Sequence, residues 1–86
     1  MQPVTIYTKP LCPYCFRALS LLQAKGVKIT EISAAFDAQK REEMIRLSNG
    51  GRTYPQIFIG KTHIGGSDDL YDLENTGRLD QLLNGA

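Results

Sequence analysis

Cys12-Pro13-Tyr14-Cys15 is the segment around which the rest of this chain is organised. It contains both cysteines of the 86 residues, three positions apart, where a strand-like run gives way to a helical pattern. Two thiols at this spacing in the first turn of a helix can form a disulfide and reopen it. The segment therefore predicts thiol redox chemistry.

The residues on both sides of this segment predict a strand, a helix and a second strand. Val4–Thr8 alternates apolar and polar residues, which is typical of a strand. Apolar residues then recur at spacings of three and four from Pro13, and this helix should stop at Gly26. Residues 27–32 alternate again. Two strands joined by one helix lie parallel, which puts Cys12 at the carboxyl end of the first strand.

The second half of the chain predicts a hairpin and three more helices. Its elements, in order, are a helix capped by Asp37 and ending near Ser48, antiparallel strands at Gln56–Ile59 and 62–64, a helix capped by Ser67 and stopping at Gly77, and a short helix at Leu79–Leu83. The expected fold class is α/β: one domain, residues 1–86, with a mixed four-stranded sheet (βαβ plus a ββ hairpin) and helices on both faces.

The first of these three helices has an apolar stripe and a charged face. We expect Met44, Ile45 and Leu47 to point inward and residues 40–43, all charged, to face water. The helix should therefore cover one face of the sheet.

Composition and charge exclude several classes of partner. The net charge of +1 gives no electrostatic basis for binding nucleic acid or an anionic membrane. No apolar run approaches the ~20 residues of a membrane helix, and the first residues lack a charged leader or cleavable apolar segment. We therefore expect a cytoplasmic protein, and we expect it to be a monomer.

The two cysteines are expected to differ in role. Cys12 should be the N-cap of the helix, with its sulfur near the backbone N–H groups of Tyr14 and Cys15, which stabilise a thiolate. Lys9 can add a positive charge nearby. These features predict an exposed, ionised nucleophile at Cys12. Cys15, one turn further into the helix, should be buried and suited to resolving the mixed disulfide.

Three other interpretations of the cysteine pair are less consistent with the sequence. A zinc site needs four ligands, whereas the chain offers two cysteines and His63, so we expect no metal site. A structural disulfide would close a loop of only four residues, which stabilises a fold by about 2 kcal/mol. Two inert thiols would not need a helix start and a lysine beside them.

These residues, together with others along the chain, resemble the glutaredoxins of the thioredoxin-like fold. The resemblance covers the whole chain and rests on residues 6–9 before the Cys12-Pro13-Tyr14-Cys15 motif, and on residues 40–44, 53–59 and 63–70. It is closest to the small bacterial dithiol glutaredoxins. Thioredoxins typically carry a tryptophan before the motif and glycine-proline inside it, and this chain has neither.

The resemblance implies a glutathione-dependent oxidoreductase with catalytic residues Cys12 and Cys15. Glutathione would be its co-substrate, no cofactor would be tightly bound, and its partners would be disulfide-containing or glutathionylated proteins. A cis peptide bond is implied between Tyr54 and Pro55. The implied glutathione-binding residues are Lys9, Tyr14, Thr53, Tyr54, Pro55, Gly66, Ser67 and Asp68.

Some features depart from the family pattern or stay open. Tyr54 stands where relatives usually have valine, and Ser67 where many have cysteine. Glutathione's glycyl carboxylate would meet Lys9, and residues that could also contact it are Gln39, Arg41 and Arg52. An alternative function is an iron–sulfur module, in which two chains hold a [2Fe–2S] cluster through Cys12 and glutathione. His63 is expected to be a strand residue without a catalytic role.

Overall fold

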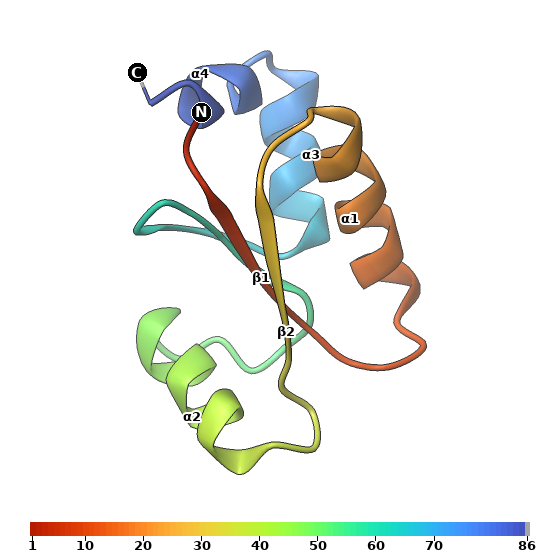
Figure 1. Cartoon of the computed structure of the whole chain (residues 1–86), viewed down its shortest axis with the longest axis vertical. Coiled ribbons are helices and arrows are strands. Elements are labelled where there is room, and N and C mark those ends of the chain that lie inside the picture. Colours follow the sequence, from red (N-terminus) through yellow and green to blue (C-terminus); the bar gives the residue numbers. More distant parts are fainter. Residues whose placement is uncertain (86) are drawn as a thin grey trace.

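The computed structural model describes residues 1–85 and contains a mixed four-stranded sheet with the strand order β2-β1-β3-β4 (Figure 1). The strands are β1 Val4–Thr8, β2 Ile29–Ser33, β3 Gln56–Ile59 and β4 Thr62–Gly65. β1 is parallel to β2 and antiparallel to β3, and β3 is antiparallel to β4. The expected combination of a βαβ unit and a hairpin is confirmed.

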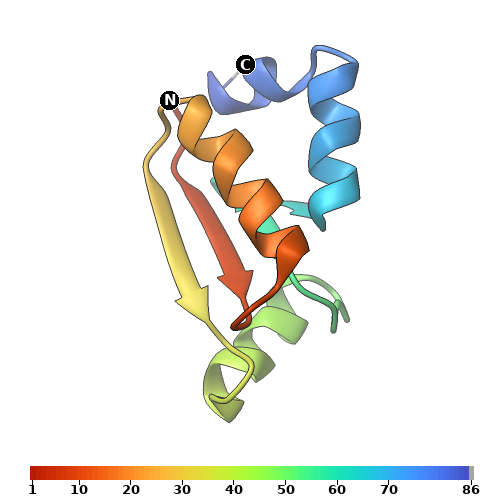
Figure 2. The same ribbon diagram turned by 90° about the vertical axis from the view of Figure 1, so that its right-hand side faces the viewer.

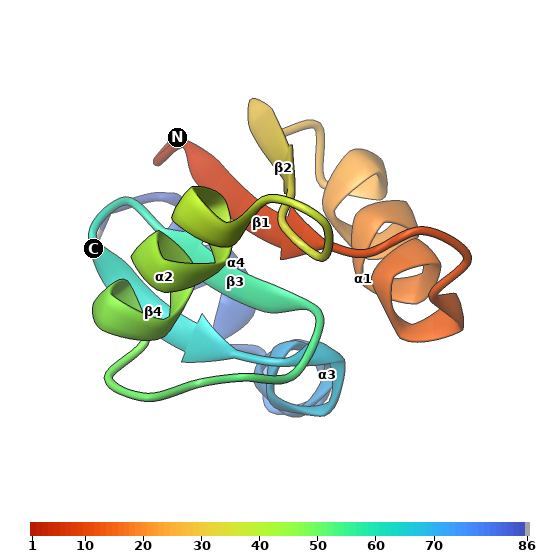
Figure 3. The same ribbon diagram turned by 90° about the horizontal axis from the view of Figure 1, so that it is seen from below.

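Four helices complete the fold: α1 Pro13–Ala24, α2 Ala38–Leu47, α3 Ser67–Asn75 and α4 Leu79–Leu83. Figures 2 and 3 show α1 and α3 together on one side of the sheet, with α2 apart from them near the carboxyl ends of β1 and β2. Across residues 1–85, no helix has the length and apolar character needed to span a membrane.

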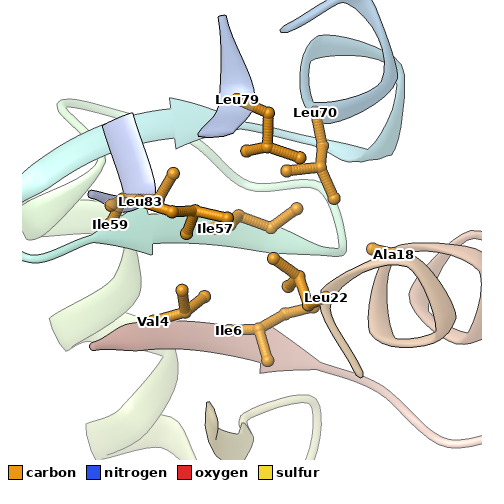
Figure 4. Packing of buried hydrophobic residues seen from close by; sticks show 9 residues of the cluster. All are labelled: Val4, Ile6, Ala18, Leu22, Ile57, Ile59, Leu70, Leu79 and Leu83. Atoms are coloured by element: carbon orange, nitrogen blue, oxygen red, sulfur yellow. The ribbon is translucent and has the colours of Figure 1, made fainter. Parts of the chain in front are cut away.

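Two clusters of buried side chains hold these layers together. There is one on each face of the sheet, because successive residues of a strand point to opposite faces. The larger cluster (Figure 4) joins β1 and β3 to α1, α3 and α4 through Val4, Ile6, Ala18, Leu22, Ile57, Ile59, Leu70, Leu79 and Leu83. The smaller one lies on the α2 side and consists of Tyr7, Ala34, Met44 and Phe58. The expected helices on both faces of the sheet are confirmed.

Three local expectations were wrong. The second strand begins at Ile29, because the chain is still leaving α1 through Gly26, which has a φ of +72°. Leu47, on the last turn of α2, is 48% exposed and, unlike Met44 and Ile45, does not pack into the smaller cluster. Glu43 does not simply face water: its carboxylate accepts a hydrogen bond from the Tyr7 hydroxyl at 2.7 Å.

The start of α3 also differs from the expectation. Gly66, rather than Ser67, is the N-cap, and Ser67 is the first residue of the helix. The Asp69 carboxylate accepts the Gly66 N–H at 3.0 Å, which supplies the side-chain half of a capping box without a cap hydroxyl. A buried serine at the first helical position results, and this matters for the site.

An ion-pair cluster fixes the far end of α1. Lys25 follows the helix, and its ammonium lies 2.8 Å from Glu74 and 2.9 Å from Asp80. These two acids hold the pKa of Lys25 above its ordinary value. One lysine therefore connects α1 to both α3 and α4.

Candidate active site

Cys12 lies between β1 and α1 and is the N-cap residue of the helix. Of the two amides expected near its sulfur, that of Cys15 donates a hydrogen bond, with 3.4 Å between nitrogen and Sγ. The backbone carbonyl of Cys12 accepts the N–H of Phe16 at 3.1 Å. The sulfur therefore faces the first turn, where the helix dipole stabilises negative charge.

Cys15 is held as a neutral thiol. Burial, followed by the hydrogen bond with Cys12, raises the pKa of Cys15 to about 11, although the backbone and charge of Lys9 act in the opposite direction. The expected burial of Cys15 is confirmed, since its exposed fraction is 2%.

The expected difference in exposure between the two cysteines was wrong. Cys12 is also only 2% exposed. Its capping geometry turns the sulfur back over the first turn of α1 instead of out into solvent. The cysteines therefore differ in their hydrogen bonds and in their position along the helix, not in their accessible area.

A groove of about 390 Å³ lies beside this motif. It is bounded by Tyr14, by the segment that leads into β3, by β4 and by the start of α3. Seven of the eight residues expected to bind glutathione line it: Tyr14, Thr53, Tyr54, Pro55, Gly66, Ser67 and Asp68. Lys9 does not, and Gln39, Arg41 and Arg52 are likewise outside the lining.

The segment entering β3 forms one wall of this groove. The Tyr54–Pro55 peptide bond is cis, as expected. Tyr54 lines the groove and also packs against the smaller cluster on the α2 side. Its hydroxyl is buried and has no hydrogen-bond partner within residues 1–85. Tyr54 is therefore both a groove residue and a core residue.

The start of α3 forms the opposite wall. Asp69 is engaged by the Gly66 amide, whereas Asp68 is exposed and lines the groove. The Ser67 hydroxyl is buried and has no partner among the described residues, although a buried polar group normally finds one. The free N–H groups and the dipole of a helix start favour an anion. This wall can therefore receive a carboxylate.

The chain that places two cysteines at a helix start beside this groove matches a known protein family. A protein-family model described as Glutaredoxin matches residues 4–64. The chain belongs to the glutaredoxin family. It is therefore an enzyme of the thiol–disulfide oxidoreductase class, with a thioredoxin-like α/β fold.

Individual glutaredoxins agree with this assignment over nearly the whole chain. Glutaredoxin 3 of Escherichia coli is 57% identical over 83 residues, covering 96% of this chain and 99% of the relative. A glutaredoxin of Pseudomonas aeruginosa is 52% identical over 84 residues, covering 98% of this chain and 99% of the relative.

Solved glutaredoxin structures match the fold as well. The solution structure of the Brucella melitensis glutaredoxin has a TM-score of 0.82 at 53% identity, covering 96% of this chain and 89% of that one. A buckwheat glutaredoxin–glutathione complex has a TM-score of 0.85 at 29% identity. The match covers 98% of this chain and 78% of the buckwheat chain. The likeness thus extends from the sequence to the backbone of the whole sheet and its helices.

One polar network in the groove was not predicted from the sequence. The Nε2 atom of His63 lies 2.7 Å from Oε1 of Gln56. Nε2 of Gln56 donates to the Thr53 carbonyl at 2.9 Å and to the Thr53 hydroxyl at 3.2 Å. The available signal was a glutamine inside an otherwise apolar buried strand, which needs polar partners.

Apolar side chains flank the motif on its outer surface. Leu11 is 89% exposed and has a positive φ of 55°, which is uncommon for a residue other than glycine, asparagine or aspartate. Tyr14 and Phe16 are more than half exposed. We call these three residues the apolar rim.

No metal site accompanies the motif in the described part of the chain. Residues 1–85 contain no group of three His, Cys, Asp or Glu side chains that could hold a metal ion.

Proposed function

We propose that this glutaredoxin uses glutathione to reduce protein disulfides, low-molecular-weight disulfides and glutathione mixed disulfides. The observation that carries the proposal is the position of the two cysteines at the start of α1, beside a groove whose far wall is the start of α3. The first feature supports disulfide exchange, and the second supports binding of a ligand with a carboxylate.

Disulfide reduction would use both cysteines. The Cys12 thiolate attacks one sulfur of the substrate disulfide, forming a mixed disulfide and releasing the first thiolate. Cys15 then loses its proton and displaces the second substrate thiol, which leaves a Cys12–Cys15 disulfide. One glutathione opens this bond, and a second glutathione releases the first as glutathione disulfide. Two electrons thus pass from two glutathione molecules to the substrate.

Deglutathionylation would need only Cys12. The thiolate attacks the glutathione sulfur of a mixed disulfide and takes over the glutathionyl group, while the protein thiol leaves. A second glutathione then attacks this group, forms glutathione disulfide and restores the thiolate. Cys15, held protonated by its raised pKa, does not compete strongly during this step.

The groove matches the chemistry of glutathione, which carries two carboxylates and one ammonium group. The first-turn amides of α3 and the unpaired Ser67 hydroxyl suit one carboxylate, and exposed Asp68 suits the ammonium. The backbone of Tyr54 suits the extended peptide, as in the addition of a strand. The solved buckwheat relative, described as a glutathione complex, supports this proposal.

Lys9 is proposed to meet the second carboxylate from outside the groove. It is exposed, and its charge already acts on Cys15. Gln39, Arg41 and Arg52 are exposed too, and no contact distinguishes one of them from the others.

The apolar rim supports protein substrates in addition to small ones. Leu11 and Phe16 flank the motif and expose apolar area that a protein segment can cover. We further propose that the enzyme works as a monomer in the cytoplasm. Neither the family match nor the named relatives favour the cluster-binding alternative.

A coupled assay tests this function. Turnover of a glutathione mixed disulfide is followed with glutathione, glutathione reductase and NADPH, beside a parallel reaction with thioredoxin reductase in their place. We expect turnover with the glutathione system and none with Cys12→Ser. Turnover supported only by thioredoxin reductase would exclude glutathione as the reductant.

A further inference from the structure

We propose that Gln56 and His63 are positioning residues that hold residues 53–55, one wall of the groove, in the conformation that receives the ligand. Gln56, His63 and Thr53 all line the groove, and they form one continuous chain of hydrogen bonds from β4 to this wall. The expected effect on turnover rests on the proposed function, whereas the hydrogen bonds and their effect on the wall do not.

The direction of each hydrogen bond follows from the Thr53 carbonyl. A carbonyl oxygen only accepts, so the amide nitrogen of Gln56 must face it, at 2.9 Å. The amide oxygen of Gln56 then faces Nε2 of His63 at 2.7 Å. That oxygen also only accepts, so Nε2 of His63 must carry a proton. The tautomer of His63 is thus set by a backbone carbonyl two hydrogen bonds away.

Packing prevents Gln56 from turning out of this chain. Its exposed fraction is 4%, and a Cβ at Gly51 would lie 2.9 Å from its amide group. Gly51 is itself held in place, because its N–H donates to the Ser48 hydroxyl at 2.8 Å. The His63 ring packs against Phe58, with 5.0 Å between centroids. Gln56, the middle member of the chain, is therefore held by buried packing, and the exposed His63 is positioned by its contact with Phe58.

The chain of hydrogen bonds also determines what the wall offers to a ligand. The Thr53 carbonyl is occupied by Gln56, and the Thr53 hydroxyl accepts the second N–H of the same amide at 3.2 Å. The hydroxyl proton remains available, so Thr53 can donate into the groove. This favours an acceptor on the ligand, such as a carboxylate or peptide carbonyl.

Two substitutions of His63 separate hydrogen bonding from packing. His63→Phe keeps an aromatic ring beside Phe58 and removes the donor to Gln56. His63→Gln removes the ring and keeps an amide donor at a similar reach. Thr62→Ala, at an exposed neighbouring position of β4, is the matched control.

The first readout needs no ligand. Hydrogen exchange at the side-chain amide of Gln56, whose Nε2 donates to Thr53, should be about three- to tenfold faster in His63→Phe, the loss expected for one hydrogen bond, and close to wild type in His63→Gln and Thr62→Ala. Equal exchange in His63→Phe and wild type, or faster exchange in His63→Gln alone, would overturn the proposal. In wild type, nitrogen NMR should find the neutral ring protonated at Nε2, and an Nδ1-protonated ring would also overturn it.

The second readout is catalytic. His63→Phe should raise KM for a glutathionylated substrate by about three- to tenfold while kcat changes little, and His63→Gln should restore KM. Wild-type turnover with glutathione tests the proposed function separately. If wild type is active and KM is the same in His63→Phe, positioning by His63 is refuted while the proposed function stands. If wild type is inactive, the proposed function fails and amide exchange decides the positioning role.

Discussion

The Cys12 sulfur accepts the backbone N–H of Cys15 at 3.4 Å, so the two cysteines already interact while both are reduced. The interaction is unequal: Cys12 accepts from the helix backbone, whereas burial and Cys12 keep Cys15 protonated. One helix turn thus gives the two sulfurs different chemistry at equal exposure.

The proposed roles predict different effects of removing each thiol. Cys12→Ser should reduce turnover of every disulfide substrate to background, because the remaining thiol, Cys15, is buried and held protonated. Cys15→Ser should keep most deglutathionylation and lose reduction of protein disulfides that need a resolving thiol. Steady-state assays on a glutathionylated peptide and on a protein disulfide measure both. Equal loss in the two variants toward the glutathionylated peptide would contradict the assignment.

The raised pKa of Cys15 predicts selective alkylation. With a pKa of about 11, only about one Cys15 in a thousand is a thiolate at pH 8. A brief iodoacetamide pulse on the reduced enzyme at pH 8 should therefore modify Cys12 and spare Cys15, with the sites read by peptide mass spectrometry. Unfolding in urea is the control, since both cysteines should then react. Comparable labelling of both cysteines in the folded enzyme would be evidence against a protonated Cys15.

Tyr7 predicts a loss of stability at high pH. Burial, and then its hydrogen bond to Glu43, raises the pKa of Tyr7 from 10.0 to about 12. The folded state therefore holds this proton more tightly, and that stabilisation, complete below pH 10, is lost as the pH rises toward 12.

Tyr7→Phe measures this contribution. It should cost about 1 kcal/mol in the free energy of unfolding at pH 7, the loss of one hydrogen bond. The difference from wild type should shrink above pH 10, because the phenylalanine has no proton to lose. Comparing the two proteins at the same pH cancels the similar effect of Cys15. A difference that stays constant from pH 7 to pH 11 would contradict the titration of Tyr7.

The apolar rim predicts selective effects on protein substrates. Leu11→Ser or Phe16→Ser should lower kcat/KM for a protein disulfide by about tenfold, since each removes part of an apolar contact, and should leave a small glutathione mixed disulfide unaffected. Leu47→Ser is the matched control, being an exposed leucine at the end of α2. Equal losses on small and protein substrates would indicate damage to the motif instead.

Ser67 predicts a gain in stability together with a loss in binding. Its hydroxyl is buried and has no partner among residues 1–85, so Ser67→Ala should raise the free energy of unfolding by up to about 1 kcal/mol. The same change should raise KM for glutathione, because a donor to the carboxylate is lost. Thermal melting and steady-state kinetics test the two halves. Lower stability in Ser67→Ala would show that the hydroxyl has a partner in solution.

Much of the fold could be predicted because its signals are local. Residue periodicity located Val4–Thr8 and Leu79–Leu83 at their observed bounds, and Asp37 caps α2 as expected. Periodicity describes a face of a helix but not what packs against it. The smaller cluster beneath α2 ends before Leu47, and nothing in the sequence indicated this.

The site was predictable where it depended on residue type and spacing. The groove brings together most of the expected residues, although they come from distant parts of the chain. Exposure was not predictable, since Cys12 is covered by a geometry set by its own φ and ψ. The partners of Gln56 were missed because they come from a turn and from the adjacent strand, and they meet only when the hairpin forms.

Lys25 links α4, the last helix, to α1, the helix that carries the two cysteines. α1 has 12 residues and so spans about 18 Å, with Cys12 before its first turn and Lys25 after its last. Glu74 and Asp80 hold the lysine, and neither belongs to the groove. Deleting α4 would remove one of these two attachments along with Leu79 and Leu83. Such a truncation would therefore loosen the helix that carries the motif, although every groove residue remains.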